Sequence, residues 1–230
     1  MSLATTAILF DLDGTLIDSA PSILQSFAAV LAQHGLQALE PLGPHLIGPP
    51  LNATLQRITG VADAGRLAEL AHTFKQHYDT AGYQASTVYP GVHQALHALQ
   101  AQGVLMAIVT NKRIHPTRLI VQHLGWQHLF AGVYAADAFT PALPGKAATI
   151  GQALQLHGLQ AQQACYVGDR SEDAEAATAA GLRFVWAPWG YMPDLDISPW
   201  PGAQCCRTPH QWLGLATSHT IQALQPHQTP

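Results

Sequence analysis

The feature that most constrains the fold is a short apolar run that recurs along the chain and stops abruptly at polar residues. The first run, Ala7-Ile8-Leu9-Phe10, ends at Asp11. Short continuous apolar runs are typical of strands that are buried on both faces of a parallel sheet. Further apolar runs occupy residues 104–109, 133–135, 164–167 and 183–186. We therefore expect these segments to form the strands of one buried sheet.

Helical patterns separate the apolar runs. Apolar residues recur at helical spacing in residues 92–100, 116–124, 146–156 and 172–180. Glycines close these segments, as is common at helix ends: Gly103, Gly125, Gly158 and Gly181. Strands that alternate with helices predict an α/β fold with a doubly wound parallel sheet. The tail after residue 188 is rich in proline and shows one weak helical pattern near 211–224.

One stretch interrupts the alternation of strands and helices. Between residues 17 and 86 no strand pattern occurs, and helical patterns cover 21–34, 51–59 and 63–80. Asp18 and Ser19 precede the first of these and are interpreted as an N-cap. We therefore predict an α/β core formed by residues 1–16 and 87–230, with a helical domain of residues 17–86 inserted directly after the first strand.

Composition argues against several classes of protein. The chain has 10 Lys and Arg against 14 Asp and Glu, which disfavours nucleic acid as a partner. No apolar window is long enough for a transmembrane helix, and no basic residues precede the first apolar run, so neither a membrane span nor a signal peptide is predicted. The three cysteines, two of them adjacent, fit a reducing compartment better than a disulfide framework. We expect a cytoplasmic protein.

Chemically active side chains follow the predicted strands or open the helices after them. They are Asp11, Asp13, Thr110, Asn111, Lys146, Asp169 and Asp173. Because ligands of open α/β sheets bind beyond the carboxyl ends of the strands, we expect these side chains to converge at one edge. Carboxylates at such short range repel one another unless a cation lies among them. An all-oxygen ligand set favours Mg²⁺, which is commonly paired with phosphate.

These segments, in this order, resemble the motifs of the haloacid dehalogenase-like (HAD) superfamily of phosphotransferases. Phe-Asp-Leu-Asp-Gly-Thr at 10–15 matches the first motif, Val109-Thr110-Asn111 the second, Lys146 the third and Gly168-Asp169-x-x-x-Asp173 the fourth. Val88-Tyr89-Pro90-Gly91-Val92 and the inserted helical domain look like the phosphoglycolate phosphatase branch, with its small helical cap. The resemblance covers essentially the whole chain and implies a Rossmann-like core.

The resemblance implies a Mg²⁺-dependent phosphatase that acts on small phosphorylated metabolites. Asp11 would be the nucleophile that forms an aspartyl phosphate, and Asp13 the general acid and base. Thr110, Asn111 and Lys146 would bind the phosphoryl oxygens. Mg²⁺ would be held by Asp11, Asp169 and the backbone carbonyl of Asp13, with Asp173 acting directly or through water. In the cap, Asn52 and Arg57 are candidate substrate contacts, and the protein would be a monomer or a homodimer.

Other functions share this scaffold. A nucleotidase or a pyrophosphatase of the same branch stays open. A β-phosphoglucomutase-like phosphotransferase typically has an arginine where Leu51 stands here, and is disfavoured. A dehalogenase would not need Asp13, Asp169 and Mg²⁺, and a phosphonoacetaldehyde hydrolase needs a cap lysine, for which only the late-placed Lys75 is present. A non-catalytic binding module is unfavourable because degenerate relatives usually lose one of the motif acids.

Overall fold

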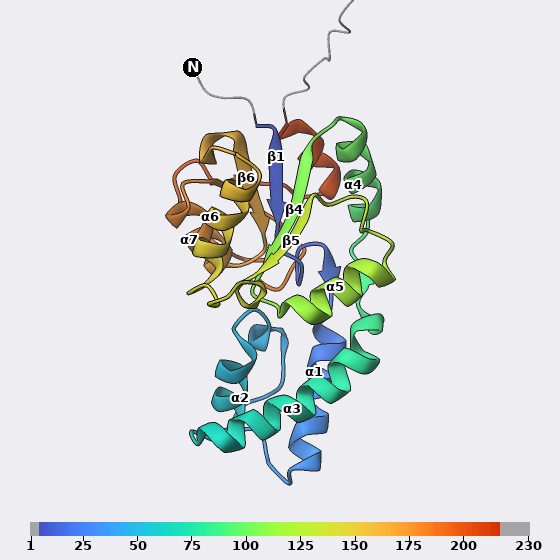
Figure 1. Ribbon diagram of the computed structural model, residues 1–230, viewed down its shortest axis with the longest axis vertical. Helices are drawn as coiled ribbons and strands as arrows, with labels where there is room; N and C mark the ends of the chain where they lie inside the picture. The colour runs from blue at the N-terminus through green and yellow to red at the C-terminus, as the bar shows by residue number, and fades with distance from the viewer. Residues whose placement is uncertain (1–4, 217–230) are drawn as a thin grey trace, which may run out of the picture.

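A six-stranded sheet forms the centre of the computed structural model, which describes residues 5–216 (Figure 1). In spatial order its strands are β5 (Gly132–Ala135), β4 (Leu105–Thr110), β1 (Ala7–Phe10), β6 (Ala164–Gly168), β7 (Arg183–Trp186) and β8 (Gln204–Cys205). Every neighbouring pair is parallel. The predicted parallel sheet is therefore confirmed. The edge strand β8 was not expected, because two residues carry no recognisable apolar pattern.

The order of the strands places β1 at the topological switch point. From β1 the chain first adds β4 and β5 on one side, and then adds β6, β7 and β8 on the other. In doubly wound sheets a crevice opens beyond the carboxyl ends of the strands where this order reverses. Asp11 follows β1 and Asp169 follows β6, so both lie at that crevice.

Helices cover both faces of the sheet, and β1 supplies side chains to both layers. Ile8 and Phe10 belong to the apolar cluster under α4 (Val92–Ala101) and α5 (Ile114–His123), whereas Ala7 and Leu9 belong to the cluster under α6 (Lys146–Leu156) and α7 (Ser171–Ala179). This alternation is the period of two expected of a strand. In Figure 1 these helix pairs lie on opposite sides of the strands.

The remaining helices form a separate bundle beyond the carboxyl ends of the strands (Figure 1). They are α1 (Ala20–Gln33), α2 (Leu51–Thr59) and α3 (Ala64–Thr80), and residues 20–85 are called the cap below. Their own apolar cluster includes Phe27, Leu55, Leu70 and Phe74. The predicted boundaries of 17–86 for an inserted domain stay a prediction.

The two chain segments that join the cap to the core pair with each other. β2 (Ile17–Asp18) and β3 (Thr87–Val88) form a short antiparallel ribbon. The expectation of no strand within 17–86 was wrong here, because a two-residue strand depends on its partner rather than on local periodicity. The helix predicted near 211–224 lies mostly outside the described residues; the part that is described belongs to a 3₁₀ helix, Pro209–Gly214. Within residues 5–216, no helix is long and apolar enough to cross a membrane.

Candidate active site

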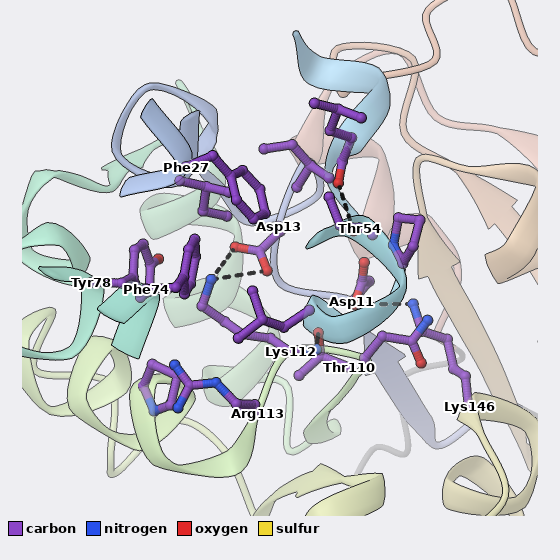
Figure 2. Close-up of a pocket in the computed structure, with 18 residues that line it drawn as sticks. Asp11, Asp13, Phe27, Thr54, Phe74, Tyr78, Thr110, Lys112, Arg113 and Lys146 are labelled. Carbon is purple, nitrogen blue, oxygen red and sulfur yellow. Dashed lines mark hydrogen bonds and ion pairs between the residues drawn. The ribbon is translucent and has the colours of Figure 1, made fainter. Parts of the chain in front are cut away.

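A cavity of about 80 Å³ lies between the strand ends and the cap (Figure 2). Its core side is formed by Asp11, Asp13, Thr110, Asn111, Lys112, Arg113, Pro116 and Lys146. Its cap side is formed by Ile23, Phe27, Leu46, Ile47, Gly48, Pro49, Leu51, Thr54, Phe74 and Tyr78. The five residues that the sequence assigned to catalysis and phosphate binding therefore lie together at this cavity.

Three buried carboxylates gather at the crevice. Asp11, Asp169 and Asp173 place carboxylate oxygens within 4.8 Å of one another. Burial is the main cause that raises the pKa of Asp11 to about 6, and it also raises the pKa of Asp169 well above its usual value. The neighbouring carboxylates act in the same direction, because ionising one charge beside another is unfavourable. A cation among them would reverse this cost.

Asp169 is fixed from several directions. Its Oδ1 accepts a hydrogen bond of 3.2 Å from the Thr15 hydroxyl, and its Oδ2 accepts one of 2.7 Å from the backbone N–H of Tyr191. Gly14 has φ +84°, and a Cβ at that position would overlap the Asp169 carboxylate. The glycine after Asp13 thus allows the turn and the close approach that the site requires.

Lys146 links two members of the acidic trio from the first residue of α6. Its Nζ lies 2.5 Å from Asp173 Oδ1 and 3.2 Å from Asp11 Oδ1. Burial lowers the pKa of Lys146, but the two carboxylates more than compensate and leave it above the usual value. Apart from this ion pair with Lys146, Asp11 Oδ1 is buried without a hydrogen-bond partner in the described structure. The oxygen therefore has room for a further contact beside the ammonium.

Asp173 also organises the loop between β6 and α7. Its second oxygen, Oδ2, accepts hydrogen bonds of 3.1 Å from the backbone N–H groups of Asp169 and Arg170. Asp173 is fully buried. The guanidinium of Arg170 pairs with Glu172 at 3.3 Å.

The carboxylate of Asp13 points away from the acidic trio, toward the cap. Lys112 Nζ lies 3.1 and 3.2 Å from the two carboxylate oxygens of Asp13 (Figure 2). The Ser19 hydroxyl donates a hydrogen bond to Asp13 Oδ1. The sequence analysis gave Lys112 no role, although its place directly after Thr110-Asn111 was an available signal. Burial lowers the pKa of Lys112, but contact with Asp13 leaves it above the usual value.

Ser19 does not cap α1 as expected, because its side chain bonds to Asp13 instead. Asp18, the other residue of the predicted N-cap, does accept a hydrogen bond of 3.0 Å from the backbone N–H of Ala20. The Tyr191 hydroxyl shares this helix end: it accepts from the backbone N–H of Ser19 at 2.9 Å and from that of Ala20 at 3.0 Å. Tyr191 lies in the proline-rich segment after β7, where no sequence pattern pointed to the site.

Two contacts across the cavity join the cap to the core. Arg113 forms a two-pronged ion pair with Asp79 of α3, with distances of 2.8 and 2.5 Å. The ammonium of Lys112 lies 4.5 Å from the centre of the Tyr78 ring. Both partners on the cap side come from the end of α3, so this helix determines how the cap sits over the strand ends.

The structure does not bring the two proposed cap contacts to the cavity. Asn52 and Arg57 are exposed on α2 and are not among the residues that line it. Arg57 instead pairs with Glu40, at 2.5 and 2.7 Å. The physical reason differs between the two residues. Leu51 and Thr54 line the cavity from the first turn of α2, and Asn52 lies about 100° around the helix from Leu51. Arg57 lies on the same face as Thr54 but one turn farther along α2, where its guanidinium contacts Glu40.

Comparison with known proteins gives concordant results. Residues 8–187 match the family model described as haloacid dehalogenase-like hydrolase. A phosphoglycolate phosphatase of Xylella fastidiosa is 34% identical over 208 residues, with 88% of this chain and 89% of the relative covered. A relative named tyrosine-protein kinase PtkA, from Mycobacterium tuberculosis, is 35% identical over 187 residues, which are 80% of this chain and 62% of that protein.

A solved structure shows the same fold. A haloacid dehalogenase-like family protein, SP0104 from Streptococcus pneumoniae, superposes with a TM-score of 0.79 at 27% identity. The alignment covers 91% of this chain and 97% of that one, so it includes both the sheet and the cap.

Proposed function

The chain belongs to the haloacid dehalogenase-like hydrolase family and is a phosphatase, and we propose that it hydrolyses small phosphomonoesters with Mg²⁺ through an aspartyl phosphate on Asp11. The observation that carries this proposal is one edge of the sheet that holds a buried carboxylate trio, a buried lysine and a separate carboxylate turned toward the cavity. Phosphoglycolate is the first substrate to test, because the Xylella relative is named for it.

The residues present fit a divalent cation. Three carboxylates converge in a buried setting, and one of their oxygens, Asp11 Oδ1, has no hydrogen-bond partner in the described part of the chain. Mg²⁺ prefers such oxygen ligands, and Asp11, Asp169 and Asp173 would hold it together with the backbone carbonyl of Asp13. When bound, the ion neutralises the charge that Asp11 and the phosphoryl oxygens bring together.

Asp11 would supply the nucleophile. Its carboxylate oxygen attacks phosphorus, the bond from phosphorus to the alcohol oxygen breaks, and an acyl phosphate forms on Asp11. Lys146 holds this carboxylate in place at 3.2 Å and offers a positive charge to the phosphoryl oxygens. Thr110 and Asn111, at the end of β4, would supply hydrogen bonds to the same oxygens.

Asp13 would carry the protons. Its carboxyl group donates a proton to the alcohol oxygen as it leaves, and then accepts a proton from the water that attacks the acyl phosphate. Its side chain is directed toward the cap side of the cavity, where the alcohol part of a substrate must lie if the phosphoryl group contacts Asp11. Ser19 and Lys112 hold the carboxylate in that direction.

The size of the cavity favours small substrates. A cavity of about 80 Å³ holds only a handful of water-sized groups. A nucleoside monophosphate has more than twice as many non-hydrogen atoms as phosphoglycolate and would need a wider opening of the cap. Closure over a small substrate also excludes bulk water and stray acceptors from the acyl phosphate. We therefore place the nucleotidase alternative behind a phosphatase for short phosphorylated metabolites.

The test is phosphate release by the purified protein from phosphoglycolate, pyrophosphate, glucose 6-phosphate and AMP, with Mg²⁺ or with EDTA. We expect turnover that needs Mg²⁺, that is highest with phosphoglycolate and that is lost in Asp11→Asn. The exposed Asp194 offers a matched control, and Asp194→Asn should keep full activity. Full activity of Asp11→Asn would contradict the proposed nucleophile. A tyrosine peptide with ATP tests transfer to a protein hydroxyl, the activity for which the mycobacterial relative is named.

A further inference from the structure

Lys112 has unused hydrogen-bonding capacity at the cavity. Its side chain is only 7% exposed, and an ammonium group has three N–H donors. Among the described residues it donates to the carboxylate of Asp13, with 3.1 and 3.2 Å to the two oxygens. The Tyr78 ring covers another side of the ammonium at 4.5 Å. A buried cation with this set of neighbours can bind one more acceptor from the cavity.

Tyr78 adds a second unpartnered group at the same place. Its hydroxyl is buried and has no hydrogen-bond partner in the described structure, although its residue lines the cavity. Buried polar groups without a partner are rare because each costs free energy, and they often mark a place that a ligand occupies. Lys112 and Tyr78 thus offer two donors where the protein itself supplies too few acceptors.

The position of Lys112 relates these donors to one part of the substrate. Asp13, which would protonate the alcohol oxygen, is held by Lys112, so the ammonium must lie beside the first atoms of the alcohol part. The cap side chains near the ammonium are largely apolar and include Phe27 and Phe74 (Figure 2). The chemistry that fits is a short alcohol part with one anionic group next to the ester oxygen.

We propose that Lys112 is a specificity-determining residue that binds a carboxylate on the alcohol part of the substrate, with the Tyr78 hydroxyl as an additional donor. This inference rests on the phosphatase function proposed above. It selects phosphorylated hydroxy acids whose carboxylate is one carbon from the phosphate ester. A neutral alcohol of the same shape would leave the buried ammonium without that acceptor and would be rejected.

The experiment compares two substrates that differ only in charge: phosphoglycolate and its amide, phosphoglycolamide. We expect the wild-type kcat/KM to favour the acid by about 100-fold, the discrimination typical of a buried charged contact. Lys112→Met should reduce this ratio to near one, and Lys112→Arg should restore part of it. Tyr78→Phe should reduce the ratio by about 5-fold, since it removes a single neutral donor. Lys75→Met, at an exposed lysine of the cap, should leave the ratio unchanged.

The ratio separates recognition from a purely structural role. If Lys112 served only to position Asp13, Lys112→Met would lower kcat/KM for both substrates by the same factor and would leave the ratio intact, which overturns the inference. Equal use of the acid and the amide by the wild type would also overturn it, even if every variant failed to fold. Hydrolysis of neither compound by folded wild-type protein would instead contradict the proposed function.

Discussion

The core side and the cap side of the cavity, called its two walls below, differ in the chemistry of their side chains. The core wall carries charge: Asp11 and Asp13 are buried after β1, and Lys146 is buried at the start of α6, where its ammonium contacts Asp11. The cap wall is mainly apolar, with Phe27 and Phe74 from two different helices. The core wall has the groups that can break a phosphate ester, and the cap wall has the shape that limits what can enter.

The difference teaches how the fold separates chemistry from selection. Each acid of the core wall is fixed by the register of a strand, so a change there alters the reaction for every substrate. The cap wall depends on how α1, α2 and α3 pack over the strand ends, so a change there alters which substrate is accepted. Lys112 belongs to the core by its backbone and to the cap by its contact with Tyr78.

The largest effect outside the nucleophile itself is expected for Lys146→Met. We expect kcat/KM to fall about 100- to 1000-fold for every substrate in the panel, because the cation that contacts Asp11 and the phosphoryl oxygens is lost. Without a metal, the variant should also unfold more easily, because Asp11 and Asp173 stay buried without their cation. Steady-state kinetics and chemical denaturation in EDTA measure the two effects.

Lys75→Met is the control for that prediction, because Lys75 is an exposed lysine on the cap. It should change neither kcat/KM nor stability. If Lys146→Met reduced activity for some substrates and spared others, the assignment of chemistry to the core wall would be contradicted. Such a pattern is expected of a residue that determines substrate specificity.

A smaller effect concerns the stability of the metal-free protein as a function of pH. Burial raises the pKa of Asp11 to about 6 in the folded state, from an ordinary value near 3.8. The folded state therefore binds the proton more tightly than the unfolded state does, and the free energy of unfolding should fall as pH rises from about 4 to 6. The raised pKa of Asp169 acts in the same direction.

Thermal unfolding in EDTA and in Mg²⁺, across this pH range, measures the effect. Mg²⁺ should stabilise the protein strongly at pH 7.5 and weakly at pH 5, because protons compete for the same oxygens at low pH. Asp11→Asn should flatten the profile in EDTA. Because Glu40, Glu172 and Asp196 have lowered pKa values and act in the opposite direction, the difference between the two proteins is what isolates Asp11. An Asp11→Asn profile in EDTA with the same pH dependence as the wild type would contradict the assignment of Asp11 as a buried, destabilised carboxylate.

Much of the core wall could be predicted from the sequence, because its side chains follow directly from strand ends. Asp11, Thr110 and Lys146 each stand at the end of a strand or the start of a helix, and local patterns locate those points. The cap wall could not be predicted in the same way. Leu51 and Asn52 are neighbours on α2, but only Leu51 lines the cavity, and that choice depends on the rotation of the helix over the sheet.

Residues that join distant segments were also beyond the reach of local patterns. Tyr191 contacts the start of α1, although 172 positions separate it from Ser19 in the sequence. Ser19 bonds to Asp13 instead of capping its own helix. Asp79 meets Arg113 only because the end of α3 packs near the start of α5. No spacing within one segment indicates such pairs; they require the relative placement of the cap and the core.

The smallest effect is expected for Tyr191→Phe, at the boundary of the two walls. The Tyr191 hydroxyl accepts a hydrogen bond from the backbone N–H of Ser19 and donates one of 3.1 Å to Asp18 Oδ1. The hydrogen bond to Asp169 is donated by the backbone N–H of Tyr191, so the substitution leaves it in place. We expect a loss of about 1–2 kcal/mol in stability and unchanged Mg²⁺ affinity.

Tyr191→Phe should affect the kinetics only by weakening the attachment of the cap to the core. KM should rise a few-fold, with kcat largely retained, because the start of α1 is held less firmly over an intact acidic trio. Tyr83→Phe is the control and should change neither quantity, because within residues 5–216 the hydroxyl that it removes accepts a hydrogen bond only from the exposed Gln84 side chain. Weaker Mg²⁺ binding by Tyr191→Phe would show that the attachment of α1 and the acidic trio are not independent. The separation of chemistry from selection would then not hold at this boundary.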